Sequence, residues 1–156
     1  MCIRDSVRAY QPEDADALAQ IFYDAVRIGA APYYATAQLQ AWAPQRPSAA
    51  VWTARLTGLI CFVACDPQPV GFMALRADGY LDLAFVAPAQ QRRGVASLLH
   101  QAVLTHAQGL GLRLLTTESS LAAQGFFAGK GWQTLARQSV QRHGQAIENF
   151  RMQREI

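Results

Sequence analysis

The chain has 156 residues, of which 51% are hydrophobic and 16% are charged, and its formal net charge is +3 at pH 7. This composition excludes an intrinsically disordered chain, and the length suits one domain, residues 1–156, with one sizeable core. There is no run of about five like charges and no stretch of about 18 apolar residues, so we expect no nucleic-acid tail and no membrane span. No signal peptide is visible, which makes the cytoplasm the expected location.

The first third of the chain predicts one short strand followed by helices. Residues 7–10 predict the strand, and residues 12–29 predict a helix because apolar side chains recur at helical spacing. Thr36 is expected to cap a second short helix and Ser48 a third, since their hydroxyls accept the unpaired N–H groups of a first turn. Residues 1–6 fit no element, and we expect them to be disordered or non-native.

The rest of the chain alternates between strands and helices. We expect helices at 94–108 and 120–130 and strands at 59–65, 70–75, 80–86, 112–117, 132–140 and 145–152. Asp78-Gly79 predicts a two-residue hairpin turn, and His143-Gly144 is expected to join the last two strands. The buried stripe of helix 94–108 is expected to include His106. This order of elements predicts one α/β or α+β sheet domain.

The cysteines and histidines lack the spacing of a disulfide framework or a metal site. Cys61 and Cys65 lie four residues apart in an apolar strand, so we expect buried thiols rather than a metal pair. The three histidines have no partners nearby in the sequence, and we interpret His100, His106 and His143 as structural. No metal is expected.

The segment that indicates chemistry is a polar turn, residues 91–96, between an apolar strand and a long helix. The first N–H groups of a helix are unpaired and carry a partial positive charge, so they bind anions without any special side chain. Gly94 lacks a Cβ, which lets phosphate oxygens approach the backbone, and Arg92 and Arg93 add positive charge. The turn is therefore shaped for a diphosphate. It matches neither a Walker-type loop nor a dinucleotide fingerprint.

Three segments, residues 8–14, 83–96 and 120–132, share their patterns with one protein family. The second, LAFVAPAQQRRGVA, ends in Gln-x-x-Gly-x-Ala after a strand, and the others are similar to that family's opening strand and its later N-x-x-A-x-x-F-Y-x-x-x-G-F segment. The order of elements agrees from about Val7 to Met152. On these grounds the chain resembles the GNAT superfamily of N-acetyltransferases.

The resemblance implies a fold and a cosubstrate. The fold would be a mixed, mostly antiparallel sheet of about six or seven strands, splayed between the fourth and fifth and flanked by about four helices. Acetyl-CoA would place its pantetheine in the splay, pairing with backbone groups around Phe85 and Val86 like an added strand. The N–H of Val86 would stabilise the developing oxyanion, typically by about 3 kcal/mol. The residues implied to bind acetyl-CoA are Phe85, Val86, Gln91, Arg92, Arg93, Gly94, Val95, Ala96, Ser120 and Phe126.

The resemblance also implies a reaction, in which a primary amine of a small molecule or a protein attacks the thioester in a ternary complex. If strand 80–86 alternates regularly, Tyr80 and Asp82 share a face with Val86 and line the path of the amine. Asp82 is the first candidate for a general base acting through water, and Glu118 is the reserve. The alternative for Asp82 is a turn cap or an ion pair with an arginine.

One position departs from the family pattern. Phe127 stands where many members carry a tyrosine that protonates the leaving thiolate, and phenylalanine cannot donate a proton. Ser119, Ser120, another tyrosine or water is then expected to serve. Ser120 also suits a cap of the following helix, and the two roles can coexist.

An aromatic group, Tyr33, Tyr34, Trp42 and Trp52, is expected either to line the acceptor pocket and select a flat or apolar amine, or to pack in the core. An acyl-CoA-binding or sensing module is the alternative function, because of Phe127. A nucleic-acid-binding domain rests on the pI of about 9.0 alone. Family members often pair through exposed final strands, so the protein is expected to be a monomer or a homodimer.

Overall fold

The computed structural model describes residues 6–156, so the expectation for residues 1–5 lies outside it, and at Ser6 the expectation is wrong because this residue begins β1. One seven-stranded sheet has the order β1-β2-β3-β4-β5-β7-β6. The strands are β1 (Ser6–Ala9), β2 (Ile60–Cys65), β3 (Pro69–Leu75), β4 (Tyr80–Val86), β5 (Leu114–Ser120), β6 (Gln133–Arg142) and β7 (Gln145–Glu155). The α-helices are α1 (Ala15–Asp24), α2 (Thr36–Trp42), α3 (Ala49–Leu56), α4 (Val95–Gly109) and α5 (Gln124–Gly129).

The sheet is mixed, as the family resemblance implied. Strands β4 and β5 are parallel, and every other neighbouring pair is antiparallel. A π-helical turn (Ala25–Gly29) extends α1, and 3-10 turns occupy Pro12–Asp14 and Pro88–Gln90. The α/β class and the order of elements are confirmed.

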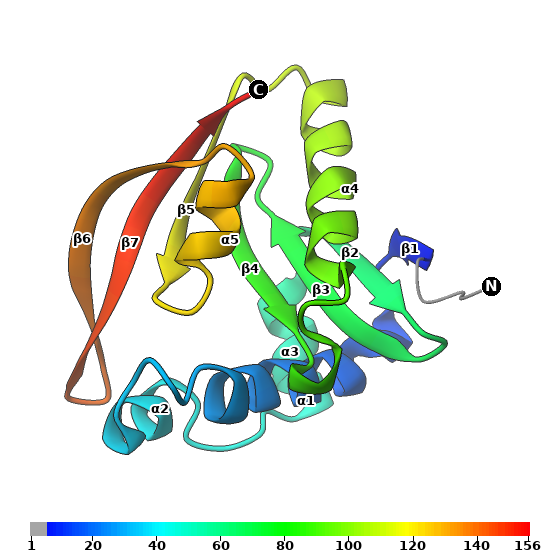
Figure 1. Cartoon of the computed structure of the whole chain (residues 1–156). Coiled ribbons are helices and arrows are strands. Elements are labelled where there is room, and N and C mark those ends of the chain that lie inside the picture. Colours follow the sequence, from blue (N-terminus) through cyan, green and yellow to red (C-terminus); the bar gives the residue numbers. More distant parts are fainter. Residues whose placement is uncertain (1–5) are drawn as a thin grey trace.

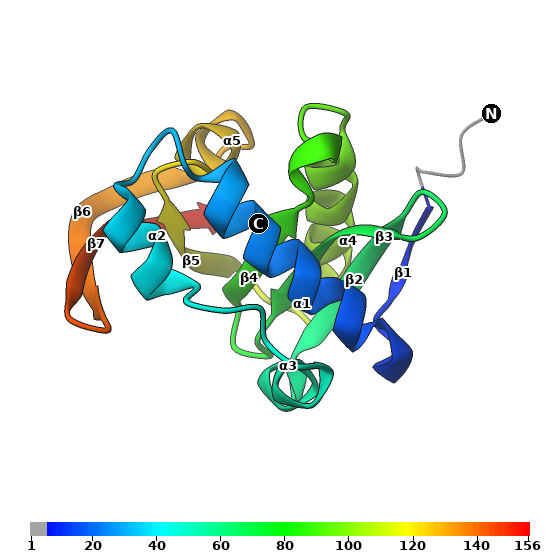
Figure 2. The same cartoon turned by 90° about the horizontal axis from the view of Figure 1, so that it is seen from below.

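Helices cover both faces of the sheet (Figures 1 and 2). On one face, α4 packs Leu99 and Val103 into a core with Met73 and Leu115 of the sheet. On the other face, α1 and α3 form a second core with β2, β3 and β4. A third, smaller core joins the π-helical turn and α2 to the β6–β7 hairpin. These helices leave the boundary between β4 and β5 uncovered.

Strands β4 and β5 pair over only two residues each. Only Tyr80↔Thr116 and Leu81↔Thr117 are in register, and Thr117 Oγ1 donates to the carbonyl of Leu81 at 2.7 Å at this last pair. Beyond it the two strands separate (Figure 1). We call this gap the splay; it confirms the separation of the fourth and fifth strands that the resemblance implied.

Several local predictions hold and others need correction. Ser48 Oγ accepts the N–H of Val51 at 3.1 Å, as expected of a cap. Thr36 does not cap α2, because the cap position is Ala35, whose N–H donates to Gln38 Oε1 at 2.8 Å. Residue 120 is the last of β5 rather than the first of a helix, so α5 begins four residues later than predicted.

Two further corrections concern α4 and the β3–β4 turn. His106 is exposed and His100 is buried, so the apolar stripe of α4 runs through the position of His100 instead. The N–H of Arg76 donates to Tyr80 O, which leaves a loop of residues 77–79 rather than two residues. Gly79 takes φ 98° in this loop, as such a hairpin requires.

Candidate active site

The turn before α4 has the geometry of an open anion site. Arg92 and Gly94 adopt left-handed backbone conformations, with φ of 64° and 83°. The first helical hydrogen bond is donated by Leu98 to Gly94 O at 3.1 Å, so the N–H groups of residues 95–97 have no acceptor within α4. A Cβ added to Gly94 would meet nothing within 4 Å. An anion can therefore reach these amides from solvent.

The two arginines of this turn are available to a ligand. Arg92 and Arg93 are exposed, and no ion pair among residues 6–156 uses either of them. The side chain of Val95 is 2% exposed and packs in the α4 core, which fixes the start of the helix. The turn is therefore anchored at Val95 and carries two exposed arginines.

The open edge of β4 presents alternate backbone groups to the splay. Ala87 donates its N–H to Val70 O at 2.8 Å, and an antiparallel ladder alternates, so Phe85 also turns its N–H and C=O towards β3. Consistently, Phe85 O lies 3.2 Å from where a Cβ of Gly71 would stand. Ala84 and Val86 direct their backbone groups into the splay. The free edge is therefore at Ala84 and Val86, and not at Phe85.

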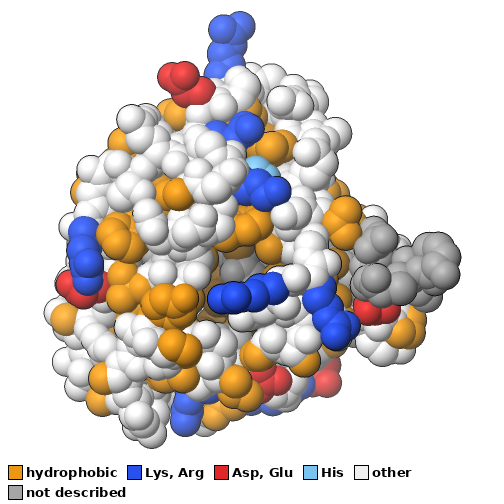
Figure 3. Space-filling model, viewed as in Figure 1, with side chains coloured by type: hydrophobic (Ala, Val, Ile, Leu, Met, Phe, Trp, Pro, Cys, Tyr) orange, Lys and Arg blue, Asp and Glu red, His pale blue; other side chains and the backbone are white. Residues whose placement is uncertain are grey.

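A cavity of about 320 Å³, which we call the Arg92 cavity, connects the turn to this free edge. Its wall includes Arg92 and Ala96 from the turn, Ala84 and Val86 from β4, and Phe126 from α5. Figure 3 shows a hollow near the middle of this face, with hydrophobic side chains around it and basic side chains at its rim. The cavity thus joins an anion site to unpaired backbone amides.

A second cavity of about 310 Å³, the Tyr80 cavity, lies at the splay and is lined by residues of β4 and β5. Its polar wall includes Tyr80, Asp82 and Glu118, and its aromatic wall is formed by Phe22, Tyr34, Trp42, Trp52 and Phe85. The two cavities share Trp42, Ala84, Phe85, Ser120, Ala123 and Phe127 as lining residues. They therefore meet at the splay.

The aromatic residues divide between the two cavities. Tyr34, Trp42 and Trp52 line the Tyr80 cavity, while Tyr33 lines the Arg92 cavity. Tyr34 and Trp52 are also core residues, 8% and 5% exposed, so the core-packing interpretation is confirmed for them, while selection of the amine stays a prediction. The sequence analysis missed Phe22, because helical spacing placed it in the core; its ring stacks on Trp52 with centroids 4.8 Å apart.

A bulge in β4 changes which side chains share a face. Leu81 lies opposite Leu75 and Leu83 lies opposite Ala74, which leaves Asp82 as an extra residue. Leu81 accordingly packs on the α4 face and Leu83 on the α1 face. The prediction that Tyr80 and Asp82 share a face with Ala84 and Val86 is therefore wrong, since the bulge breaks the alternation.

Asp82 is held by a residue that the sequence analysis did not single out. Arg55 of α3 donates from both terminal nitrogens to its carboxylate, at 2.9 and 3.0 Å. No sequence signal pairs these residues, which lie 27 positions apart on different elements. Glu118 is exposed, and its Oε2 accepts from Gln138 Nε2 at 2.9 Å. The cavity therefore contains one paired and one unpaired carboxylate.

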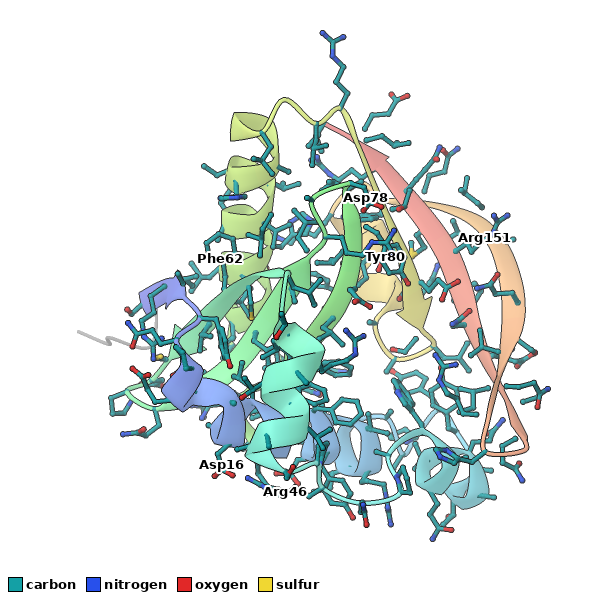
Figure 4. All side chains as sticks on the ribbon, turned by 180° about the vertical axis from the view of Figure 1, so that it is seen from behind. Asp16, Arg46, Phe62, Asp78, Tyr80 and Arg151 are labelled. Atoms are coloured by element: carbon teal, nitrogen blue, oxygen red, sulfur yellow. The ribbon has the colours of Figure 1, made fainter. Side chains whose placement is uncertain are left out.

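Tyr80 completes the polar wall, and Figure 4 shows it beside β4 on the side of β5. Burial, followed by the negative charges of Glu118 and Asp82, raises the pKa of Tyr80 to about 12. Its hydroxyl is therefore protonated at neutral pH and can donate a hydrogen bond. It cannot act as a base there.

The residues at the junction of the cavities are fixed by local hydrogen bonds. Ser120 Oγ accepts the N–H of Ala123 at 3.1 Å, so its own hydrogen is free to point elsewhere. Tyr34 cannot serve as a free donor, because its hydroxyl accepts from Leu121 N and donates to Glu148 O. Phe127 is 2% exposed and lines both cavities. Ser120 is therefore the hydroxyl at the junction with an uncommitted proton.

The remaining titratable residues have structural roles. His100 Nε2 accepts from Trp132 Nε1 at 2.9 Å in the core, and His143 Nδ1 lies 2.7 Å from Ala41 O. Cys61 and Cys65 are buried free thiols, and burial raises the pKa of Cys61 to about 12. Within residues 6–156, no three His, Cys, Asp or Glu side chains gather as a metal site, and no helix is long and apolar enough to span a membrane.

Comparison with known proteins identifies the family. Residues 30–155 match the model of the acetyltransferase (GNAT) domain. The chain is 37% identical over 147 residues to the uncharacterized N-acetyltransferase YafP of Escherichia coli K12, covering 94% of this chain and 93% of that protein.

Solved structures of acetyltransferases have the same fold as this chain. A GCN5-related N-acetyltransferase from Rhodopseudomonas palustris superposes with a TM-score of 0.91 at 32% identity, over 97% of this chain and 95% of that one. The phosphinothricin acetyltransferase Pat of Sinorhizobium meliloti has the same fold, with a TM-score of 0.75 at 18% identity, over 97% of this chain and 88% of that one. The chain therefore belongs to the GNAT family of acetyltransferases, which confirms the family and the enzyme class that its sequence resembles.

Proposed function

We propose that the protein transfers the acetyl group of acetyl-CoA to a primary amine of a small molecule or a peptide. The observation that carries this proposal is the meeting of two cavities at the free edge of β4, one leading to an anion site and one lined by carboxylates. Pat of Sinorhizobium meliloti, which has the same fold, was solved in complex with acetyl-CoA. The arrangement supports a ternary complex in which both substrates are bound at once.

The chain's own groups would divide the binding of acetyl-CoA between the turn and the strand. The N–H groups of residues 92–96, with Arg92 and Arg93, would hold the diphosphate at the start of α4. Ala84 and Val86 would pair with the pantetheine amides as an added strand does. One of these two N–H groups would also donate to the thioester oxygen, which typically contributes about 3 kcal/mol to catalysis.

Acetyl-CoA supplies the thioester carbonyl, and the residues of the junction supply the proton transfers. A carboxylate of the Tyr80 cavity would accept the proton that the amine loses. Ser120 would donate to the departing thiolate, because Phe127 has no hydroxyl and the proton of Ser120 is uncommitted. The aromatic wall would hold the body of the amine, with Phe22, Trp42 and Phe85 half-buried beside the cavity.

The diphosphate site is tested by titrating CoA into a matched pair of variants. Gly94→Glu places bulk and negative charge at the turn, and we expect it to abolish calorimetric binding of CoA. Gly58→Glu is the control, because Gly58 has φ 82° against 83° for Gly94, also has nothing within 4 Å of an added Cβ, and lies outside both cavities. Equal CoA affinity in the two variants would reject this placement.

The reaction itself is tested by the release of free thiol from acetyl-CoA across a panel of alkylamines, arylalkylamines and lysine-containing peptides. We expect amine-dependent release with at least one class. Phe127 favours the alternative of a module that binds acyl-CoA and does little chemistry. Measurable CoA binding without thiol release for any amine would support that alternative instead.

A further inference from the structure

Two carboxylates stand at the closed end of the splay. The parallel pairing of β4 and β5 ends at Leu81↔Thr117, so the next residues along the two strands are Asp82 and Glu118. Both line the Tyr80 cavity, one from each side of the splay. An amine that enters this cavity towards Ser120 passes between them.

Asp82 is already committed to Arg55. Both of its oxygens accept from the guanidinium, at 2.9 and 3.0 Å, and its side chain is 20% exposed. Taking up a proton would remove an acceptor from this bidentate pair, so the pair opposes the use of Asp82 as a base. The same pair ties α3, which carries Trp52 in the aromatic wall, to β4. The geometry of the Asp82–Arg55 pair therefore suits a role in holding the aromatic wall in place.

Glu118 is uncommitted by comparison. Its neighbours are neutral donors: its Oε2 accepts from the amide of Gln138 on β6, and the hydroxyl of Tyr80 interacts with the same carboxylate. Arg151 lies opposite it in register on β7 but forms no ion pair with it in the described part of the chain. Figure 4 shows Arg151 on the β7–β6 side of the sheet, while Tyr80 lies across the splay.

The charged and titratable groups around Glu118 come from four elements. Tyr80 and Asp82 lie on β4, and Arg55 of α3 is bonded to Asp82. Arg151 lies opposite Glu118 on β7, and Arg142 of β6 lines the same cavity. Tyr80 is neutral at physiological pH, and the charge of Asp82 is matched by that of Arg55. Glu118 thus has only neutral hydrogen-bond donors and no ion pair within residues 6–156, beside the path of the amine.

We propose that Glu118 accepts the proton of the attacking amine, and that Asp82 and Arg55 are a positioning pair that fixes α3 over the cavity. This inference rests on the proposed acetyl transfer. Glu118 takes the extra proton of the protonated amine, directly or through one water, and passes it to solvent. The neutral nitrogen then forms a bond to the thioester carbonyl carbon, and the C–S bond breaks. The proton that the nitrogen loses in this step replaces the one that Ser120 gives to the thiolate.

The test compares variants with two kinds of acceptor. One is the alkyl- or arylalkylamine that gives the fastest thiol release, which is protonated at neutral pH and needs a base. The other is hydroxylamine, which is already largely neutral there. We expect Glu118→Gln to lower kcat for the basic amine about 100-fold and kcat for hydroxylamine less than about fivefold.

The positioning pair should behave differently. We expect Asp82→Asn and Arg55→Gln each to raise KM for the basic amine about tenfold while changing kcat less than about fivefold, and the double variant to add nothing further, because the two residues act as a unit. Glu155→Gln, an exposed carboxylate at the far end of β7, is the matched control and should leave both constants unchanged.

The outcomes separate this inference from the function on which it rests. If Glu118→Gln keeps its kcat while Asp82→Asn loses it, the roles are reversed and the inference is overturned, although acetyl transfer stands. Equal losses with the basic amine and hydroxylamine would also overturn it, since the loss would not come from proton removal. If the unmodified protein acetylates no amine, the proposed function fails and this inference fails with it.

Discussion

Acidification is expected to destabilise the core behind the Arg92 cavity through one histidine. His100 is 3% exposed and accepts from Trp132 Nε1 at 2.9 Å, so it must be neutral in the folded protein. It packs edge-on against Phe126 and Phe127, which line the cavity. Burial, aided by the positive charges of Arg154 and Lys130, lowers its pKa from the ordinary 6.5 to about 4.

The sign and size of the effect follow from this lowered pKa. Between pH 6.5 and about 4 the unfolded chain protonates His100 while the folded chain does not, so stability falls as pH falls through this window. Above the window both states are neutral and the residue adds no pH dependence. Each pH unit is worth about 1.4 kcal/mol, so a change from about pH 7 to about pH 5 removes about 2 kcal/mol.

The measurement is urea unfolding followed by tryptophan fluorescence at the two pH values, for the natural protein and for His100→Gln. The variant lacks the titrating ring, so its free energy of unfolding should fall about 2 kcal/mol less over this range. Other acid-sensitive groups, such as Asp14, are present in both proteins and cancel in the comparison. Equal losses in the two proteins would refute the reasoning.

Three further outcomes are expected. Gly79→Ala should cost at least about 2 kcal/mol of unfolding free energy, because Gly79 has φ 98° and an added Cβ would lie 2.7 Å from Leu114 O; a loss near zero in urea unfolding would contradict this. Asp14→Asn should cost about 2–3 kcal/mol at neutral pH, because Arg8 donates to both carboxylate oxygens of a residue that is 5% exposed. Since the hydrogen bonds from Arg8, helped by the N–H of Gln11, hold the pKa of Asp14 below its ordinary value against the opposing effect of burial, the difference from the natural protein should shrink as pH falls below that ordinary value, and a constant difference would count against the ion pair. Ser120→Ala should lower kcat about tenfold with CoA affinity unchanged, and an unaltered kcat would exclude Ser120 as the proton donor.

Local patterns in the sequence determined most of the elements and the turn that precedes α4. Apolar spacing predicted α4 and the bounds of β4 within a residue, because side-chain periodicity is a property of the segment itself. The turn at residues 91–96 was predicted for the same reason, because the first N–H groups of a helix lack acceptors wherever the helix packs, and Gly94 permits the left-handed backbone there. The hairpin turn at His143-Gly144 likewise follows from residues that tolerate positive φ, here 47° and 79°.

Only the tertiary structure decided how the side chains of the Tyr80 cavity are arranged. The bulge at Asp82 arises from the register of β3 on β4, and register depends on pairing between strands rather than on either strand alone. The hydrogen bonds from Arg55 to Asp82 join residues 27 positions apart. They leave Glu118 as the carboxylate of this cavity that has no ion pair in the described part of the chain. Contacts between distant elements depend on how helices and strands pack. The sequence alone therefore could not decide whether Asp82 or Glu118 is the better candidate for the base.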